Sequence, residues 1–558
     1  MLTPEYLNKC PEYFVQLYQE LEDFILQDVA RRIAKAGEIT DTAQWQMLRL
    51  KELGMATKEI RQKITQINEM TLREINAVFQ NAARESFDFE EKIYSKAGRK
   101  PIPLEENEAL QALLSAAMQQ TAGEMRNFTQ SLGFMEMVNG KAVFRPIADV
   151  YQNTLDLMQM TVSTGAMDVK SAVRTATKRL MDSGVRTVDY ASGWVNHVDV
   201  AARRAIVTGV NQLSAKMTDQ LADDLGAEFF ETTAHARARP SHQVWQGQVF
   251  HRGGAKDGYP DFESVTGLGT VGGLCGANCR HSYFPFFPGI SVRAYSQKRL
   301  ENIDPPPVTY NGKTYTAYES TQKQRQMETA MRKTKREMLG YEAAGLEEDF
   351  TSAAIKLKRQ QEAYAEFSKA AGIHKQTERA QVVGFGHSQA SRASWAYRKF
   401  EKSAPSVILD DKEKSAVLRY ISGESYSINA KLRHKSLLEP YEKEFIKDLD
   451  SALNKFPKYH GTVIRDLTFF NKDSLKEFAK QHSVDNIVQY DAFTSSSIKE
   501  DYQNSPTVRL KIQSNSGRDL RAYNKEENEI LFPRRVKFKV KQISLENGLF
   551  IVEMEEFE

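Results

Sequence analysis

The chain of 558 residues has little of several features that mark particular classes of protein. It has only three cysteines, which excludes a secreted scaffold held together by disulfides. No run of about 18 apolar residues occurs, so we expect no segment that spans a membrane. The 76 basic and 73 acidic side chains nearly cancel, to a net charge of +3. Because no overall positive field exists, we predict no sequence-specific binding of nucleic acid.

The opening segment also lacks the parts of a secretory signal. It is acidic and amphipathic, without a basic n-region or an apolar h-region, so we expect no export by that route. Hydrophobic residues make up 41% of the chain, which is enough to bury substantial cores. At roughly 150 residues per domain, the length predicts three or four domains.

The pattern of apolar residues divides the chain into four regions. Residues 1–230 carry apolar stripes at three- and four-residue steps, typical of helices that pack on one another or on partner subunits. Residues 231–290 mix short aromatic runs with glycines, cysteines and prolines, which favours a small Cys/His-containing module of strands and loops. Residues 291–384 predict a charged helical connector. Residues 385–558 change to short helices followed by alternating strands, which predicts an α+β domain.

A glycine-rich segment, Gly267–Gly272, matches the pattern GxGxxG. A dinucleotide-binding fingerprint requires a strand before this pattern and a helix after it. Here the sequence continues as GLCGANCRHSYFPFFPG, which does not form a helix. We therefore interpret the segment as a loop.

Two cysteines and several histidines lie in the same module. Cys275, Cys279 and His281 are close together, with His235 and His242 upstream. Zinc prefers thiolate and imidazole ligands in tetrahedral sets, so a structural zinc ion held by Cys275, Cys279, His281 and His235 is one interpretation. The C-x3-C-x-H spacing departs from the common C-x2-C pattern, and buried free thiols with hydrogen-bonded histidines are the alternative.

The C-terminal region carries three polar pieces in a fixed order. They are an arginine in TVIRDLTFF (Arg465), the hydroxyl-rich run in YDAFTSSSI (Ser495, Ser496, Ser497) and the acidic pair in YNKEENEILFP (Glu527, Glu529). Residues two apart on a strand share a face, so both carboxylates would point the same way. One carboxylate can stabilise an oxocarbenium-like sugar, and the planar guanidinium binds phosphate oxygens. Together they suit cleavage of a glycosidic bond in a phosphate-bearing substrate.

The order of these pieces resembles the R-S-E mono-ADP-ribosyltransferase toxins. The likeness lies in an arginine, then Phe-x-Ser-(Thr/Ser)-Ser, then Glu-x-Glu before an apolar strand and proline, and it is strongest in ENEILFPRRVKFKV. It covers about residues 385–558. The resemblance implies a split antiparallel β-sandwich with helices, with NAD as co-substrate. It further implies transfer of ADP-ribose to an arginine of a host protein, with release of nicotinamide.

The resemblance also assigns roles to individual residues. Arg465 would bind the NAD phosphates, and Ser495 would orient the catalytic carboxylate and contact the nicotinamide ribose. Glu529 would stabilise the oxocarbenium ion. Phe493 and Ser497 would complete the NAD-binding residues.

Acceptor recognition is expected just before the last strand. Glu527, the first acid of Glu-x-Glu, implies a guanidinium acceptor, and Tyr523 would touch the protein substrate. The sequence departs mildly from the family, because Ile464 and Asp466 flank the arginine and Ser496 replaces the commoner threonine. Neither change removes a reacting group.

The first 340 or so residues resemble phage minor capsid proteins of the group related to Mu protein F. The strings ARRAIVTGVNQ, HARARPSHQVWQGQVF and GLCGANCRHSYFPF carry this likeness. It implies a portal-associated place in the virion among phage portal and capsid proteins. The enzyme would reach the host cytoplasm with the DNA or be released to the extracellular region. Two alternatives stay open, namely a structural capsid protein with an inactive transferase-like domain and an NAD glycohydrolase.

Overall fold

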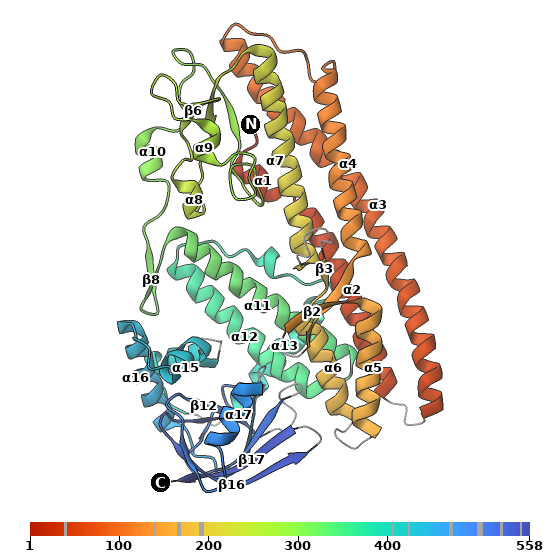
Figure 1. Cartoon of the computed structure of the whole chain (residues 1–558), viewed down its shortest axis with the longest axis vertical. Coiled ribbons are helices and arrows are strands. Elements are labelled where there is room, and N and C mark those ends of the chain that lie inside the picture. Colours follow the sequence, from red (N-terminus) through yellow and green to blue (C-terminus); the bar gives the residue numbers. More distant parts are fainter. Residues whose placement is uncertain are drawn as a thin grey trace.

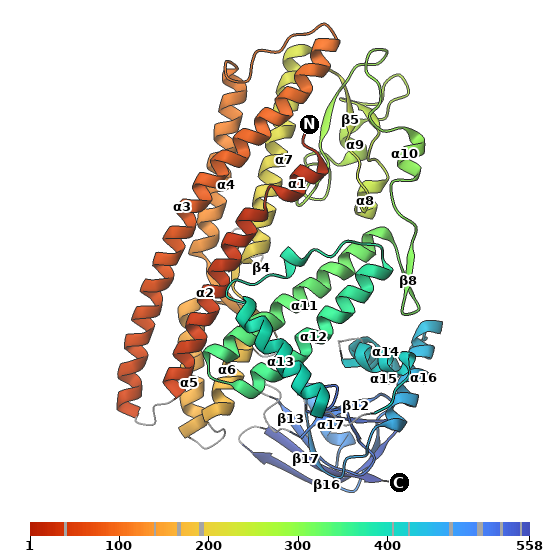
Figure 2. The same cartoon turned by 180° about the vertical axis from the view of Figure 1, so that it is seen from behind.

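The computed structural model describes residues 1–37, 42–138, 141–163, 169–188, 195–403, 407–421, 425–467, 472–498, 506–524, 528–546 and 549–557. Figure 1 shows long N-terminal helices side by side, with a loop-rich module at one end of the molecule and the C-terminal sheet at the other. Figure 2 shows the same separation from behind. Within the described part of the chain, no helix has the length and apolar character needed to cross a membrane.

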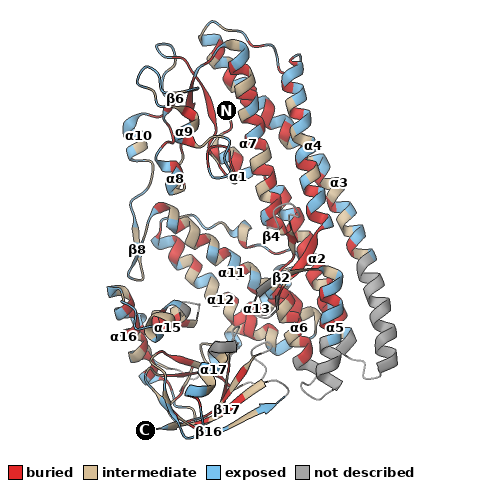
Figure 3. Cartoon of the chain, in the orientation of Figure 1, coloured by how far each residue is buried: buried red, intermediate tan, exposed pale blue. Residues whose placement is uncertain are grey.

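Long helices build the N-terminal region. They are α1 (Pro4–Lys9), α2 (Glu12–Gly37), α3 (Thr42–Lys96), α4 (Glu108–Gln130), α5 (Ile147–Ser163), α6 (Val169–Ser183) and α7 (Val198–Leu225). Helix α7 packs against α2, α3 and α4. Its small and apolar residues lie on several faces, so it is buried along most of its length (Figure 3).

A small sheet interrupts these helices, where the apolar pattern predicts helices alone. Its strands are β1 (Leu132–Val138), β2 (Lys141–Pro146), β3 (Arg186–Val188) and β4 (Val195–His197), in the order β2-β1-β3-β4. Runs of three to seven residues are too short for their periodicity to separate strand from helix, which explains the difference.

The loop-rich module follows α7. Its elements are β5 (Phe229–Thr232), α8 (Pro240–Gln243), β6 (Val249–His251), α9 (Phe262–Thr266), β7 (Tyr283–Phe286) and α10 (Gln297–Glu301), with sheet order β6-β5-β7. The segment Gly267–Gly272 lies in turns after α9, as expected of a loop. Ser282 Oγ donates to the carbonyl of Leu2 at 2.8 Å, which ties the module to the start of the chain.

A helical region with one hairpin connects the module to the last domain. It contains β8 (Val308–Tyr310), β9 (Lys313–Tyr315), α11 (Ala317–Ala343), α12 (Glu347–Ala370), the 3-10 helix η1 (Thr377–Ala380) and α13 (His387–Ser403). Arg336 of α11 pairs with Glu22 at 2.7 Å and Asp23 at 2.8 Å on α2, and all three are buried. One hydrophobic core continues from Leu2 to Ala396, so these regions pack as one body.

The C-terminal domain joins helices to a mixed sheet. Its elements are α14 (Asp411–Arg419), α15 (Ser425–Arg433), α16 (Pro440–Lys455), β10 (Gly461–Leu467), α17 (Lys472–Gln481), β11 (Ile487–Gln489), β12 (Thr494–Ser497), β13 (Val508–Ser514), β14 (Arg518–Asp519), β15 (Glu529–Phe532), β16 (Lys537–Glu546) and β17 (Leu549–Phe557). The order is β11-β16-β17-β13-β10-β12-β15-β14, and β13 and β17 run parallel. The mostly helical N-terminal region and the α+β C-terminal domain are thus confirmed.

This sheet separates two cores. Leu531 of β15 faces a core shared with α14, α15 and α16, whereas its neighbours Ile530 and Phe532 face a core shared with β13, β16 and β17. Successive side chains of a strand point to opposite faces, which explains the alternation.

A buried carboxyl group lies between α3 and α7. Glu90 is 1% exposed, and its Oε1 lies 2.5 Å from Thr218 Oγ1. The Thr218 hydroxyl donates to Glu90 Oε1 and also lies 3.0 Å from the carbonyl of Ser214, so its one proton is shared between two acceptors. Burial raises the pKa of Glu90 to about 8. The folded state therefore holds this proton more tightly than the unfolded chain, and its stabilising effect is lost as pH rises from about 4.5 to about 8.

We predict that Glu90→Gln raises the melting temperature at pH 8 and leaves it nearly unchanged at pH 5. The neutral amide avoids a desolvation cost of up to ~4 kcal/mol that the ionised carboxyl pays. Thermal melts of the full chain at both values measure the difference. Glu69→Gln, an exposed change on the same helix, is the matched control. Equal pH dependence in wild type and Glu90→Gln would contradict the assignment.

Candidate active site

A short strand in the middle of the C-terminal sheet joins the three predicted pieces. On one side of β12, Ser497 stands opposite Ile464 of β10. On the other side, the same Ser497 stands opposite Glu529 of β15. Directly opposed residues of antiparallel strands share a face, so Ser497 and Glu529 project from the same face of the sheet.

The arginine reaches β12 through its side chain. Because Ile464 stands opposite Ser497, strand alternation alone does not place Arg465 on the face of Glu529. The connection is made by the guanidinium, whose Nη1 donates to the carbonyl of Ser495 at 2.5 Å. Ser495 in turn opposes Leu531, two residues from Glu529. One hydrogen bond therefore links the arginine to the strand that pairs with the acidic strand.

The charge of Arg465 acts on two other residues of the domain. Burial and, in second place, the positive charge of Arg465 lower the pKa of Arg433 at the end of α15. Burial raises the pKa of Tyr490, and Arg465 opposes that shift. Two guanidinium groups whose charges repel each other favour a bound anion, and a diphosphate matches their planar donors.

The carboxylate of Glu529 is held by the turn that precedes it. Glu529 is 2% exposed, and its Oε2 accepts a hydrogen bond from Asn524 Nδ2 at 2.8 Å. The Glu529 amide donates to the carbonyl of Asn524 at 3.3 Å. Asn528, with φ of 47°, has the left-handed conformation that asparagine tolerates and so turns the chain into β15. The preceding turn therefore fixes the carboxylate of Glu529 at the first residue of β15.

The residues of β12 divide between the site and the core. Ser496 is buried, and its Oγ donates to the carbonyl of Ile530 at 2.7 Å, which fixes β12 on β15. Ser495 is half-buried and Ser497 is buried. Phe493 is a core residue that packs edge-on against Tyr420, with ring centroids 5.7 Å apart. Phe493, which directly precedes β12, therefore packs in the core that Leu531 shares with α14, α15 and α16.

The predicted acceptor region is partly described. Tyr523 packs on Phe456, with ring centroids 5.4 Å apart. The guanidinium carbon of Arg359, on α12, lies 5.4 Å from the centre of the Tyr523 ring. Glu527 lies outside the described residues, as do residues 499–505 between β12 and β13.

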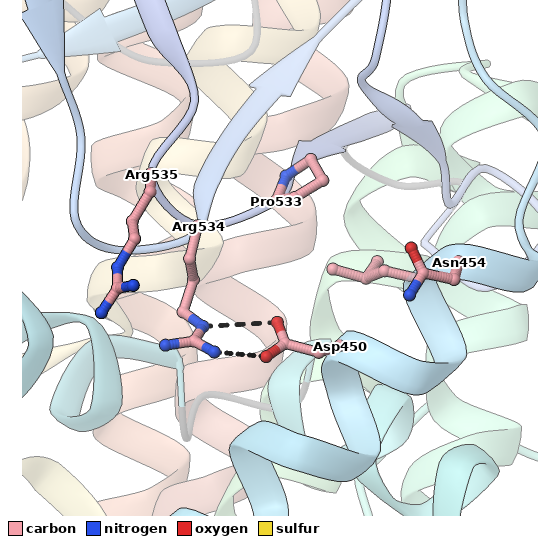
Figure 4. Close-up of a pocket in the computed structure, with 6 residues that line it drawn as sticks. Asp450, Asn454, Pro533, Arg534 and Arg535 are labelled. Atoms are coloured by element: carbon pink, nitrogen blue, oxygen red, sulfur yellow. Dashed lines mark hydrogen bonds and ion pairs between the residues drawn. The ribbon is translucent and has the colours of Figure 1, made fainter.

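A separate pocket of about 240 Å³ lies where α16 ends and β15 turns into β16. It is lined by Asp450, Leu453, Asn454, Pro533, Arg534 and Arg535. Figure 4 shows the ion pair between Arg534 and Asp450 that occupies one side of it. None of the predicted site residues that the structure describes lines this pocket, although the guanidinium carbon of Arg534 lies 5.6 Å from the centre of the Phe493 ring.

Sequence reasoning missed two residues of the site. Arg433 ends the helix written SYSINAKLR, and its sequence signal is that of any basic residue at a helix C-terminus. Asn524 carries a stronger signal, because an asparagine in a turn five residues before a strand carboxylate is a ready side-chain donor.

The cysteines and histidines of the module also gather, though in a different set from the one predicted. His242, Cys279 and His281 are buried, and their ligand atoms all lie within 4.8 Å of one another. His235 stacks on the His281 ring, and its Nδ1 bonds to the carbonyl of Ala236 at 2.8 Å. Cys275 Sγ contacts Asn211 Oδ1 at 3.6 Å.

Comparison with known proteins assigns families to both halves of the chain. Residues 2–369 match the family model of phage minor capsid protein 2, and residues 392–555 match that of the ADP-ribosyltransferase exoenzyme. The expected resemblances to phage minor capsid proteins and to ADP-ribosyltransferases are thereby confirmed.

Two curated relatives match the C-terminal part. The NAD(+)–protein-arginine ADP-ribosyltransferase Tre1 of Serratia proteamaculans is 28% identical over 146 residues, which are 26% of this chain and 31% of the relative. The putative NAD(+)–arginine ADP-ribosyltransferase Mav of Mycobacterium avium is 31% identical over 153 residues, 26% of this chain and 18% of the relative. The chain thus spans less than a third of either relative.

Among solved structures, Exoenzyme S from Pseudomonas aeruginosa, in complex with human 14-3-3 protein beta and bound to carba-NAD, is similar to the same region. It is 17% identical, covers 28% of this chain and 80% of its own, and has a TM-score of 0.25.

We predict that Ser496→Ala loosens β12 from β15. The change removes a buried hydrogen bond with a net contribution of about 1 kcal/mol, which is roughly a fivefold change in an opening equilibrium. Amides of β12 and β15 should then exchange about five times faster in hydrogen–deuterium exchange. Ser483→Ala, an exposed change in the same domain, should leave them unchanged. Unaltered protection of both strands would show that this hydroxyl does not hold them.

Proposed function

The chain belongs to the phage minor capsid protein 2 family and carries an ADP-ribosyltransferase exoenzyme domain at residues 392–555, and from this premise we propose the reaction of that domain. We propose that it transfers ADP-ribose from NAD to the guanidinium of an arginine on a host protein and releases nicotinamide. The arginine specificity in the names of both curated relatives supports this acceptor.

One observation carries the proposal. Strand β12 pairs with β10 and with β15, and Arg465 bonds to its Ser495 carbonyl. A cation for phosphate, hydroxyls for the ribose and a carboxylate for the reacting carbon are therefore parts of one connected unit. This donor set fits a dinucleotide with a labile glycosidic bond.

The basic side of the site binds the diphosphate. Arg465 and Arg433 offer two guanidinium groups, whose charges oppose one another until an anion is bound. Binding an anion relieves that repulsion, so these residues contribute most when the dinucleotide is bound.

The acidic side acts on the ribose. As the bond between the ribose and nicotinamide breaks, its electron pair leaves with nicotinamide and positive charge develops on the sugar. Glu529 offsets that charge, and Asn524 holds the carboxylate in place before the reaction begins. Glu527 takes a proton from the acceptor guanidinium while the guanidinium nitrogen bonds to the ribose carbon.

The N-terminal region determines where the enzyme is located. We infer that residues 2–369 assemble with phage portal or capsid proteins in the virion, as the family match supports. The transferase would then enter the host with the phage genome or reach the extracellular region, and it would act on a host protein.

We predict that Glu529→Gln lowers transfer to a free guanidine such as agmatine by at least about a hundredfold, because the charge that offsets the oxocarbenium ion is lost. The full chain is incubated with labelled NAD and agmatine, and ADP-ribosylated agmatine is measured. In the same assay Glu527→Gln should lower transfer at least about tenfold while NAD hydrolysis stays within about threefold of wild type.

Glu477→Gln, an exposed change in the same domain, is the control and should match wild type. Free ADP-ribose without labelled acceptor would support an NAD glycohydrolase instead. Unchanged transfer and unchanged NAD hydrolysis in Glu529→Gln would contradict the proposed reaction. Absence of both activities in wild type would contradict it as well.

A further inference from the structure

The buried Cys/His cluster lies in the loop-rich module, at the far end of the molecule from the transferase sheet (Figures 1 and 2). His242 closes the short helix α8, and Cys279 and His281 precede β7. These three residues are 2%, 1% and 1% exposed. Polar side chains so deeply buried require partners that satisfy them.

The distances within the cluster match those around a tetrahedral metal ion. His242 Nδ1 lies 3.3 Å from His281 Nδ1, and Cys279 Sγ lies 3.8 Å from each of these nitrogens. Zinc bonds of about 2.0–2.1 Å to nitrogen and about 2.3 Å to sulfur give edges of about 3.3 Å between nitrogens and about 3.6 Å between sulfur and nitrogen. The observed triangle is close to that size.

The remaining ring nitrogens fix the tautomers. His242 Nε2 bonds to the carbonyl of Gly272 at 2.9 Å, and His281 Nε2 bonds to Gln246 Oε1 at 3.1 Å. Since a carbonyl oxygen only accepts and the Gln246 Oε1 also accepts from the His235 amide, both Nε2 atoms carry the hydrogen. The two Nδ1 lone pairs then face each other, which requires a cation between them. Metal-bound histidines use this same outer hydrogen bond.

Backbone groups surround the sulfur of the cluster. The His281 amide donates to Cys279 Sγ at 3.4 Å. Cys275 and Cys279 flank the His281 carbonyl oxygen, with Sγ atoms at 3.8 and 3.7 Å.

We propose that His242, His281 and Cys279 bind one zinc ion. His235 is not a ligand. The ion joins two segments of the module that are 37 residues apart, from His242 to Cys279. A module with a three-stranded sheet and short helices has little other regular structure, so the metal holds its loops together.

Metal content of the purified full chain tests this site. Elemental analysis should find about one zinc per chain in wild type, below about 0.2 in Cys279→Ser and His242→Ala, and about one in Cys10→Ser, Cys275→Ser and His235→Ala. Cobalt loading of wild type should give a thiolate-to-cobalt charge-transfer band that Cys279→Ser lacks, which keeps the test valid where a variant folds poorly.

No bound zinc in wild type after zinc loading, together with no charge-transfer band, would overturn the proposal. Full zinc in Cys279→Ser would do the same. Loss of zinc in Cys275→Ser or in His235→Ala would restore the corresponding ligand of the set that the sequence suggested.

A different observation concerns the contact between the capsid region and the transferase. Arg359 of α12 donates from Nη2 to the carbonyl of Ala522 at 2.9 Å, and its guanidinium carbon lies 5.4 Å from the centre of the Tyr523 ring. The same guanidinium lies 5.8 Å from the Phe400 ring of α13. One arginine therefore holds the turn that also carries Asn524, the partner of Glu529.

We infer that Arg359 restrains this turn in the intact chain and so limits access of an acceptor guanidinium to the site. The inference rests on the proposed transferase function. The turn at Ala522 and Tyr523 cannot move to fit an acceptor without losing its hydrogen bond and its ring contact with Arg359. Release of the turn from α12 therefore favours transfer of ADP-ribose to the acceptor over hydrolysis of NAD.

We predict that Arg359→Ala in the full chain raises the ratio of agmatine transfer to NAD hydrolysis at least about threefold. Arg359→Lys, which lacks the planar guanidinium, should give a ratio between those of wild type and Arg359→Ala. Gln361→Ala, on the same helix, should give the wild-type ratio. Equal ratios in wild type and Arg359→Ala would contradict the restraint. Absence of both activities in wild type would instead contradict the proposed function.

Discussion

The C-terminal domain depends on the pairing of β12 with a strand on each side. This strand has four residues, yet it carries the Ser495 carbonyl that accepts from Arg465 and the Ser497 that opposes Glu529. The hydroxyl of Ser496 donates to the carbonyl of Ile530 and so holds β12 on β15. Phe493, which directly precedes β12, is part of a hydrophobic core. A shift of β12 by one residue would exchange core and site side chains, because successive residues face opposite sides. The register is therefore a condition for the chemistry as well as for the fold.

The rest of the molecule supports that unit at a distance. One hydrophobic core runs through the N-terminal helices, the loop-rich module and the connector, and two further cores lie on the faces of the C-terminal sheet. The two parts therefore have separate cores. Arg359 links them at the turn beside the acidic strand, and the proposed zinc site lies at the other end of the molecule. The division corresponds to the two family matches, phage minor capsid protein 2 for residues 2–369 and the ADP-ribosyltransferase exoenzyme for residues 392–555.

Much of this organisation could be predicted from sequence, and the failures have physical causes. The order of Arg465, the β12 serines and Glu529 was sufficient to find the strands that pair. Strand alternation is not sufficient to place the Arg465 side chain. The register fixes which face a residue lies on, but not how far a long side chain extends, and here the guanidinium reaches the Ser495 carbonyl. Arg433 was missed because a basic residue at a helix end is common. The proposed zinc set contains His242 in place of His235, because the sequence does not show which ring turns inward. The four N-terminal strands are too short for their period to be recognised.

A structure of the full chain bound to a non-hydrolysable NAD analogue tests the central claim most directly. We expect the diphosphate against Arg465 and the nicotinamide ribose within hydrogen-bond distance of Glu529, with β12 between them. An analogue bound in the pocket of Asp450 and Arg534, or one that leaves Arg465 bonded only to Ser495, would contradict the account.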